Sequence, residues 1–487
     1  MSKIRGPIVI TPNGKLEGIR HSGYASFHGI PYAQAPVNGL RFALPVPASS
    51  WEGVRPATAF GPTPLQIEEA GLVPEPAIPG EDILNVSVYT PFPDPLAALP
   101  VMVWIHGGAY TGGSPASPWY DGRSFARDGI VTVVVSYRLG FAGFAAIPGA
   151  EANLGVHDWI LALKWVQEHI AAFGGDPQRV TLAGQSAGAG AVLTLLGIPA
   201  ATSLFRAAWA ASPVLPVRTR AEAEETTRRL AKRLGVAATR EGLSAVTEET
   251  ILAEQMKAAR PRGVSLSRLI EYSPFYSPVV DGELIVEPTL DALEHGSGRH
   301  VDLVVGSNDQ EIMFPEKALP RWLDLVPDAV LLYATGLRGH QLRDYQSQQR
   351  LAGVSGAAAT LDQEVTDRVF RRQVVRVARV RAQAMASTHL YRFSWPSPTK
   401  QGAIHCLDLP FFWDVLDRAD VGPIAGGRPP QALANAIHGA AVKLVEGVGP
   451  DWPQWDDVHG RIAVLGKEDA PVSFSEHGYA GLGPLLG

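Results

Sequence analysis

The stretch that most constrains this chain is a Gly-x-Ser-x-Gly turn between a strand pattern and a helix pattern. Residues 179–183 are rich in β-formers, residues 184–188 are Gly-Gln-Ser-Ala-Gly, and an Ala- and Leu-rich run follows. Because Gly184 and Gly188 lack a Cβ atom, the strand and the helix can approach each other closely. The Ser186 hydroxyl is then held out at the sheet edge, above the helix N-terminus. This context predicts a nucleophilic serine rather than an ordinary turn before a helix.

The segments around this turn alternate between buried strands and a helix. Residues 101–105 and 130–135 are continuous apolar runs, as in parallel strands that are covered on both faces. Residues 154–173 carry apolar side chains at helical spacing. The order strand, helix, strand predicts a doubly wound α/β sheet. Later core strands are expected at 301–305 and 390–395.

The remaining segments predict additions to this sheet. Residues 4–60 are rich in Gly, Pro and β-formers, which favours a small antiparallel sheet. Residues 219–275 predict a helical insertion that covers the carboxyl edge of the sheet as a lid. A second helical region is expected at 316–386. We expect residues 1–487 to form a single catalytic domain, because no repeat or long low-complexity linker divides the sequence.

One helix of this second region, at 361–386, carries several arginines. A solvated helix face explains them better than an anion-binding patch does. They are Arg368, Arg371, Arg372, Arg376 and Arg379.

Composition narrows the class of protein. The 487 residues are 46% hydrophobic and 18% charged, as in a globular chain with a large core. The net charge of -6 favours neither a nucleic acid nor an anionic membrane as a partner. The single cysteine, Cys406, excludes an internal disulfide and fits a reducing compartment. With no signal-peptide pattern and no spanning run, we expect a soluble cytoplasmic protein. A leader removed beforehand and the oligomeric state both stay open.

A serine hydroxyl is a poor nucleophile near neutral pH, so it needs a base that a carboxylate orients. In the α/β-hydrolase arrangement the order along the chain is Ser, acid, His, on loops that follow later strands. After the strand at 301–305, Asp309 and Glu311 both qualify as the acid. Position alone does not separate them, and a solvated loop carboxylate is the competing explanation for each.

Six histidines follow these carboxylates, and one lies where the base is expected. His405 comes just after the strand at 390–395 and before the apolar residues 407–412. We therefore favour His405 as the base. The others are explained most simply as surface or locally bonded histidines: His340, His389, His438, His459 and His477.

Acyl transfer also needs N–H donors for the oxyanion that develops on the substrate. The backbone N–H of Ala187 supplies one, and the Gly-rich loop 106–109 is expected to supply the rest. A phosphate cradle is the alternative for this loop, but no Walker lysine follows, and no G-x-G-x-x-G opens a helix.

Metal and thiol chemistry find little support in the sequence. It has no H-E-x-x-H motif, and a lone cysteine excludes a multi-cysteine site, so we expect no metal and no cofactor. A thiol nucleophile at Cys406 is less plausible than a small buried residue, because the elbow serine is already present.

Several further motifs spread over nearly the whole chain. With them, the chain resembles the type-B carboxylesterase/lipase family of cholinesterase-like α/β-hydrolases, of the bacterial para-nitrobenzyl esterase type. The resemblance implies a large, mostly parallel central sheet with helices on both faces, a small N-terminal antiparallel sheet and helical lid insertions. The motifs are Gly29-Ile30-Pro31-Tyr32-Ala33, Trp51-Glu52-Gly53, Glu81-Asp82-Ile83-Leu84, Tyr137-Arg138-Leu139-Gly140, Phe173-Gly174-Gly175-Asp176-Pro177 and Gly402-Ala403-Ile404-His405.

The resemblance also implies roles for site residues. The family acid is a glutamate, fifth after a glycine, which corresponds to Glu311 after Gly306. The family base corresponds to His405, and Ser212 is expected to hydrogen-bond the triad from behind. The implied oxyanion donors are the backbone N–H groups of Gly108, Ala109 and Ala187.

The chain departs from the family pattern at positions that leave every catalytic group in place. Ile83 stands where secreted members carry a cysteine, and Ala109 replaces the third oxyanion glycine. Gln310 and Ile312 flank the acid in place of the usual Asp and Gly, and Pro213 follows Ser212 in place of the usual Gly.

These observations predict a serine hydrolase that cleaves carboxylic esters of small molecules through a Ser-His-Glu triad and an acyl-enzyme. Amide or carbamate hydrolysis by the same triad is the alternative within enzymes. A non-catalytic binding protein on this scaffold is disfavoured, because all three triad positions are present. The substrate stays open, because the aromatic residues that could line a gorge could equally pack in the core: Tyr110, Trp119, Phe314, Phe411, Phe412 and Trp413.

Overall fold

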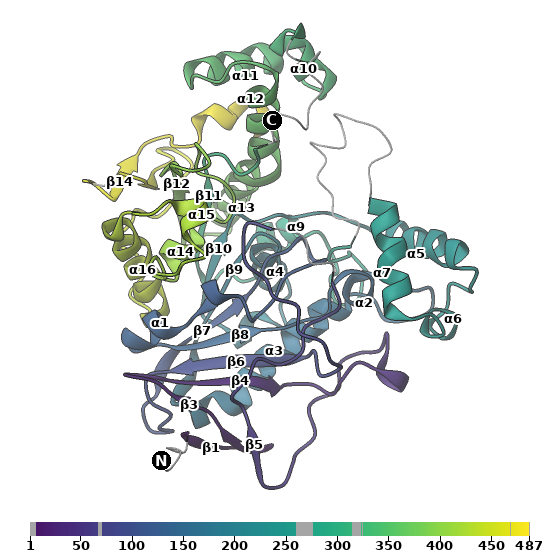
Figure 1. Ribbon diagram of the computed structural model, residues 1–487. Helices are drawn as coiled ribbons and strands as arrows, with labels where there is room; N and C mark the ends of the chain where they lie inside the picture. Colours follow the sequence, from purple (N-terminus) through teal and green to yellow (C-terminus); the bar gives the residue numbers. More distant parts are fainter. Residues whose placement is uncertain are drawn as a thin grey trace.

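The computed structural model describes residues 6–66, 71–259, 276–313, 323, 325–467 and 469–486. Phe314 and residues 260–275, the last part of the expected lid, lie outside the described residues. An eleven-stranded mixed sheet runs through the molecule, and a separate three-stranded sheet lies near the N-terminus (Figure 1).

The central sheet is parallel in its middle and antiparallel at both edges. Its order is β14-β13-β12-β11-β10-β9-β7-β8-β6-β4-β3. The predicted large, mostly parallel sheet is therefore confirmed. The parallel strands are β7 (Leu99–Ile105), β8 (Val131–Val135), β9 (Gly175–Gln185), β10 (Ala207–Ala211), β11 (Asp302–Asn308), β12 (Thr388–Phe393) and β13 (Ile462–Leu465). The antiparallel edge strands are β3 (Ile19–Arg20), β4 (Ala25–Pro31), β6 (Asn85–Thr90) and β14 (Val472–Ser475).

The small N-terminal sheet differs in part from the expected antiparallel one. β1 (Ile8–Thr11) and β2 (Gly14–Glu17) form an antiparallel hairpin, but β5 (Val54–Pro56) pairs with β2 in parallel. β4, also expected in this sheet, instead pairs with β6 of the central sheet. Its residues are almost all buried, so it needs neighbours on both faces, which only the larger sheet provides.

Helices cover both faces of the central sheet because its side chains alternate between two apolar cores. In β7, Val101, Val103 and Ile105 belong to one core, whereas Met102 and Trp104 belong to the other. The first core contains side chains of α3 (Leu154–His169), α4 (Ala187–Leu196) and α13 (Arg372–Gln383). The second contains side chains of α1 (Arg123–Arg127), α14 (Leu409–Phe412) and α16 (Gln431–Glu446).

Two helical groups extend from this core (Figure 1). The first comprises α5 (Arg220–Leu234), α6 (Arg240–Ser244) and α7 (Glu248–Ala259), which lie together at the right of the view. The second comprises α10 (Asp328–Ala334), α11 (Gly339–Leu351) and α12 (Ala357–Val365), which project at the top. A π-helical segment, η6 (Thr366–Arg371), joins α12 to α13. The lid role of the first group stays a prediction.

The other helical segments are short. They are η1 (Asn38–Leu40), η2 (Pro118–Tyr120), α2 (Gly140–Phe144), η3 (Ile170–Phe173), η4 (Thr202–Leu204), α9 (Thr289–Glu294), α15 (Gly422–Ala425), η7 (Ala480–Leu482) and α17 (Gly483–Leu486).

The expected solvated face of arginines is confirmed for only part of the helix that carries them. Arg376 is exposed, and so is the side chain of Arg379 (42%). Arg368 and Arg371 instead form ion pairs one turn back, with Glu364 and Asp367, and their side chains are 21% and 12% exposed.

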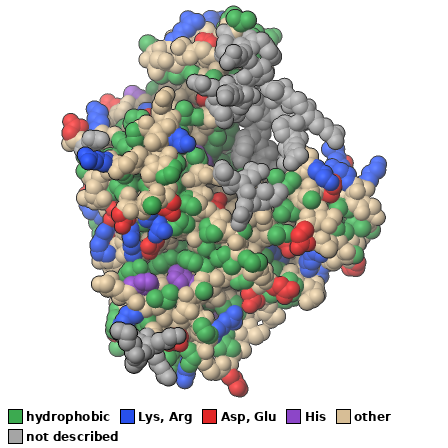
Figure 2. Space-filling view, viewed as in Figure 1, with side chains coloured by type: hydrophobic (Ala, Val, Ile, Leu, Met, Phe, Trp, Pro, Cys, Tyr) green, Lys and Arg blue, Asp and Glu red, His purple; other side chains and the backbone are tan. Residues whose placement is uncertain are grey.

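The outer surface is mixed in charge on the face shown in Figure 2, where basic and acidic side chains are interspersed. Across the described ranges, no helix combines the length and apolar character needed to cross a membrane.

Candidate active site

Ser186 forms a sharp turn between β9 and α4. Its backbone has φ +58° and ψ -121°, a conformation that side-chain-bearing residues adopt only at a cost. The Ser186 N–H donates to the Ala211 carbonyl at the end of β10, at 2.8 Å. The Ser186 carbonyl accepts from the Gly190 N–H at 2.9 Å. Hydrogen bonds on both sides therefore hold the strained turn.

The two glycines of the turn are required by close backbone contacts. A Cβ on Gly184 would lie 2.5 Å from the Gly188 carbonyl oxygen. A Cβ on Gly188 would lie 2.0 Å from the Ile105 carbonyl oxygen. Any larger residue would push α4 away from β7 and β9. The close approach inferred from the sequence is confirmed.

Glu311 lies just beyond β11 and contacts His405 directly. Its Oε2 is 2.6 Å from His405 Nδ1, and the glutamate is 2% exposed. Its Oε1 accepts the Ser212 hydroxyl at 2.6 Å and the Asn308 backbone N–H at 2.7 Å. Both oxygens of this buried carboxylate are therefore fixed, and Ser212 bonds the acid from behind.

Asp309, the other candidate acid, points to a different partner. Its two oxygens accept from Arg392 Nε and Nη2, each at 2.8 Å. The arginine sits on β12, next to β11. The structure therefore brings Glu311, and not Asp309, to the imidazole of His405.

The acid loop and the histidine loop are joined to each other by hydrogen bonds. The Gln310 N–H donates to the Ala403 carbonyl at 3.1 Å, and the Ala403 N–H donates to Gln310 Oε1 at 2.9 Å. The Asn308 side chain donates to the Ile404 carbonyl at 2.6 Å. Gln310, one of the departures from the family pattern, thus takes part in fixing the histidine loop.

The other ring nitrogen of His405 faces the Ser186 turn. His405 Nε2 lies 3.1 Å from Nε2 of Gln185, the residue before the serine. The Phe370 ring packs against the imidazole, with 4.9 Å between ring centroids. Within the described residues, Ser186 Oγ makes no hydrogen bond of its own. The imidazole thus links the acid to the serine turn through the amide of Gln185.

The surroundings favour the charged form of His405. Burial disfavours the imidazolium, but the hydrogen-bonded Glu311 carboxylate outweighs it, so the pKa of His405 lies above its usual value. Burial raises the pKa of the neighbouring Cys406 thiol, although His405 opposes this shift. A thiol that stays protonated is a poor nucleophile, so Cys406 is a buried neighbour of His405.

Residues 106–110 form a loop with several positive φ angles close to the serine turn. Gly108, Ala109 and Tyr110 have φ values of +102°, +53° and +62°. A Cβ on Gly107 would lie 3.2 Å from Ser186 Cβ, so this loop runs beside the serine. In the described part of the chain, no acceptor takes the N–H groups of the three expected donors. These are Gly108, Ala109 and Ala187.

The same loop is anchored on both sides. His106 Nδ1 bonds the Gly107 carbonyl at 2.8 Å, and the Tyr137 hydroxyl donates to the His106 carbonyl at 2.9 Å. Burial lowers the pKa of His106 to about 4, so this imidazole is neutral. The Gln66 side chain donates to the Gly113 carbonyl at 2.8 Å and accepts from its N–H at 2.7 Å.

The other histidines lie elsewhere in the fold. His389 and His438 are buried and bond the carbonyls of Trp452 and Phe412. His340 is exposed on α11, His459 bonds Asp456, and the His477 N–H donates to the His459 carbonyl.

The aromatic residues considered for a gorge are part of the cores wherever the structure describes them. Their side chains are all buried, which favours packing over a gorge lining, and Phe314 lies outside the described residues. They are Tyr110, Trp119, Phe411, Phe412 and Trp413.

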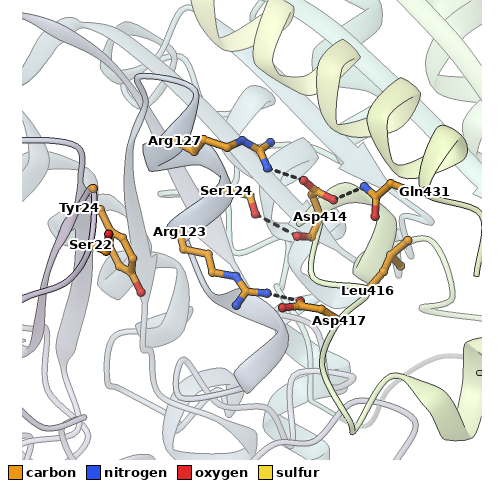
Figure 3. Close-up of a pocket in the computed structure, with 10 residues that line it drawn as sticks. Ser22, Tyr24, Arg123, Ser124, Arg127, Asp414, Leu416, Asp417 and Gln431 are labelled. Carbon is orange, nitrogen blue, oxygen red and sulfur yellow. Dashed lines mark hydrogen bonds and ion pairs between the residues drawn. The ribbon is translucent and has the colours of Figure 1, made fainter.

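A separate cavity of about 710 Å³ lies beside α1 (Figure 3). Its arginines are already paired, Arg123 with Asp417 and Arg127 with Asp414. None of the residues Ser186, Glu311 and His405 lines it. In the described ranges, no group of three or more His, Cys, Asp or Glu side chains could hold a metal ion.

Sequence analysis missed two residues that contact the acid and the base. Gln185 and Asn308 lie one and three positions from Ser186 and Glu311. A search for polar side chains that flank the catalytic positions would have found both. The partners of their side chains, His405 and the Ile404 carbonyl, in contrast, come from a loop far away in the sequence.

Known proteins resemble this chain over nearly its full length. The carboxylesterase family matches residues 5–417. Para-nitrobenzyl esterase of Bacillus subtilis (strain 168) is 33% identical over 95% of this chain and 95% of its own. Phenmedipham hydrolase of Pseudarthrobacter oxydans is 32% identical over 96% of this chain and 97% of its own. Fumonisin B1 esterase of Sphingopyxis macrogoltabida is 31% identical over 94% of this chain and 86% of its own.

Solved structures agree with these relatives. A PNB esterase structure superposes with a TM-score of 0.85 at 29% identity, covering 99% of each chain. A carboxylesterase of Geobacillus stearothermophilus superposes with a TM-score of 0.84 at 31% identity, covering 97% of this chain and 98% of its own. The fold, the matched family and the esterase relatives lead to one conclusion: this chain belongs to the carboxylesterase family and is a carboxylic ester hydrolase.

Proposed function

We propose that Ser186, His405 and Glu311 act as a catalytic triad that cleaves carboxylic esters through an acyl-enzyme. The observation that carries the proposal is the 2.6 Å contact between Glu311 Oε2 and His405 Nδ1. It leaves the other imidazole nitrogen facing the turn that holds Ser186, because that nitrogen contacts the preceding Gln185. A serine, a base and an orienting carboxylate in this sequence of contacts suit nucleophilic catalysis.

In the acylation step, His405 Nε2 takes the proton of Ser186 as Oγ attacks the ester carbonyl carbon. The negative charge moves to the former carbonyl oxygen. The N–H groups of Gly108, Ala109 and Ala187 receive this oxyanion, and their lack of other acceptors among the described residues supports the role. The C–O bond to the alcohol then breaks, and His405 gives its proton to the leaving oxygen.

In the deacylation step, His405 takes a proton from water as the water oxygen attacks the acyl carbon. The acyl–Oγ bond breaks, and the proton returns to Ser186. Glu311 orients His405 in both steps and stabilises the imidazolium. The bonds from Ser212 and Asn308 keep the glutamate in place.

We propose a small-molecule ester as the substrate, since two relatives are named para-nitrobenzyl esterase and fumonisin B1 esterase. Amide or carbamate hydrolysis would use the same triad and differ in how well the leaving amine is protonated. Parallel assays on an ester, an anilide and a carbamate with the same acyl side decide between them. We expect the ester to have the highest kcat/KM.

We also propose that residues 1–487 work as one catalytic unit, with a lid region at 219–275 and a helical region at 316–386. The lone cysteine supports the cytoplasm as its location, because it precludes any internal disulfide.

A fluorophosphonate probe tests the nucleophile, because it reacts covalently with activated serines. We expect one adduct, located by mass spectrometry on the peptide that contains Ser186. Ser186→Ala should abolish the labelling, and Ser212→Ala should retain it. An active enzyme that is labelled at another serine would overturn the assignment.

A further inference from the structure

Gln185 is the buried polar residue that reaches the catalytic base without a place in the triad. It ends β9, pairs with Ala211 of β10 and is 1% exposed. Its Nε2 lies 3.1 Å from His405 Nε2. A Cβ on Gly107 would lie 2.9 Å from its Oε1. The amide therefore sits between the imidazole and the loop of the expected oxyanion donors.

The direction of the hydrogen bond follows from the other side of the imidazole. At 2.6 Å from the Glu311 carboxylate, His405 Nδ1 must carry a proton. At a pH above the pKa of His405 the ring is neutral and Nε2 is a bare acceptor, so the Gln185 amide is then the donor. A single ring lone pair accepts one well-aligned hydrogen bond. Gln185 thus occupies the atom that must take the Ser186 proton.

We propose that Gln185 is a positioning residue that holds His405 Nε2 in the free enzyme and yields it to Ser186 when substrate binds. This inference rests on the proposed triad. Once Nε2 carries the serine proton, an amide N–H facing it would be repelled. A half-turn about the Cγ–Cδ bond brings Oε1 to Nε2–H, so the same side chain serves both protonation states.

The absence of charge on Gln185 is part of the inference. The groups around the imidazole that titrate are Glu311, the Cys406 thiol and Asp408. Burial and the nearby Glu311 raise the pKa of Asp408 to about 6, and this carboxyl bonds Tyr391. A further carboxylate at position 185 would favour the imidazolium before substrate arrives. A neutral amide holds the ring without adding to the upward shift of the His405 pKa that Glu311 already causes.

Two variants test this role through different readouts. Gln185→Glu should shift the acid limb of the kcat/KM profile upward by about one pH unit or more, because an adjacent carboxylate favours the imidazolium. Gln185→Met keeps the length but has no hydrogen-bonding group. It should lower kcat about three- to tenfold with little change in KM, and it should shift the ¹⁵N resonance of His405 Nε2.

Gln349→Glu is the matched control, because Gln349 is also buried but donates to the Thr360 carbonyl away from the triad. It should leave the acid limb unchanged. Circular dichroism and the unfolding midpoint show whether each variant is folded.

The outcomes distinguish a failure of the Gln185 role from a failure of the proposed triad. Suppose that the wild type is labelled at Ser186. If Gln185→Glu then keeps the wild-type acid limb, or folded Gln185→Met keeps the wild-type kcat and ¹⁵N shift, the proposed role of Gln185 is wrong. The triad would stand in either case. If the active wild type is not labelled at Ser186, the proposed function fails first.

Discussion

At the scale of single residues, Asp309 and Glu311 both lie just beyond β11 but hydrogen-bond to different partners. Glu311 is bound by His405, Ser212 and Asn308, whereas Asp309 is bound by Arg392. The first set of contacts holds the Glu311 carboxylate against the imidazole. The second joins two neighbouring strands. The two residues should therefore respond differently to the loss of one negative charge.

We predict that Glu311→Gln lowers kcat/KM by on the order of 10²–10⁴, because the amide neither stabilises the imidazolium nor keeps the ring in its tautomer. Asp309→Asn should retain activity within about tenfold. Steady-state kinetics on one chromogenic ester measures both. The opposite ranking would move the acid to Asp309.

The pH dependence of kcat/KM tests the contact between Glu311 and His405. His405 must be neutral to accept the serine proton, so kcat/KM falls as the pH drops through its pKa. Burial opposes the charge, but the Glu311 carboxylate raises this pKa, so the acid limb should lie above 6.5, the usual histidine value. Glu311→Gln should move the limb downward. An acid limb well below 6.5 in the wild type would contradict the assigned contacts.

The sequence locates Ser186 and His405 from their neighbours alone, because the serine turn and the loop after a late strand are local patterns. It does not separate Asp309 from Glu311, since both follow the same strand. What separates them is Arg392, on a strand that the topology places alongside. Such a partner can be recognised only when the order of the strands in the sheet is known.

At the scale of elements, the serine turn depends on how closely α4 packs against β7. The Ile105 carbonyl lies where a side chain at 188 would begin. Backbone atoms of a central strand cannot move aside cheaply, because the neighbouring strands hold them in the sheet.

We predict that Gly188→Ala destabilises the protein by about 1–3 kcal/mol and sharply lowers activity, because α4 must shift. Gly439→Ala in α16 is the matched control, since among the described residues nothing beyond its chain neighbours and its own helix backbone lies within 4 Å of its Cβ position. It should be neutral or stabilise by about 0.5–1 kcal/mol. Chemical unfolding and ester turnover are measured together. Equal effects of the two substitutions would refute the packing argument.

Element prediction failed where contacts, rather than periodicity, decide the structure. The arginines near 370 looked solvated, but Arg368 and Arg371, within the π-helical segment η6, pair with carboxylates one turn back. The short strands β13 and β14 were not predicted. Four residues each are too few for a clear pattern, and they become strands by adding to an existing edge.

At the scale of the whole molecule, a buried ion pair ties the N-terminal segments to the sheet and its helices. The side chains of Arg138 and Asp158 form two hydrogen bonds of 2.6 and 2.8 Å and are 2% and 0% exposed. Arg138 also donates to the Ala43 carbonyl at 2.7 Å. Losing the aspartate would leave an uncompensated buried charge.

We predict that Asp158→Asn lowers the free energy of unfolding by about 3–5 kcal/mol. Asp82→Asn is the control: its pair with Arg55 is 3.5 Å long and exposed, so its loss should cost about 1 kcal/mol or less. Denaturant titration of both variants gives the comparison. A cost at Asp158 no larger than at Asp82 would show that the buried pair is not a structural anchor.

The large-scale architecture could be predicted because continuous apolar runs such as 101–105 are typical of buried parallel strands and fit few other structures. β4 was assigned to the wrong sheet, because its sequence does not show that β6 would be its partner. The motif resemblance, and not the periodicity, indicated how the serine, acid and histidine loops belong together.

The central claim is that Ser186 is the nucleophile of a Ser-His-Glu triad, and turnover of Ser186→Ala tests it most directly. With the fold verified by circular dichroism, kcat on a carboxylic ester should fall by roughly 10⁴–10⁶. A folded Ser186→Ala enzyme that turns over the ester at nearly the wild-type rate would contradict the account.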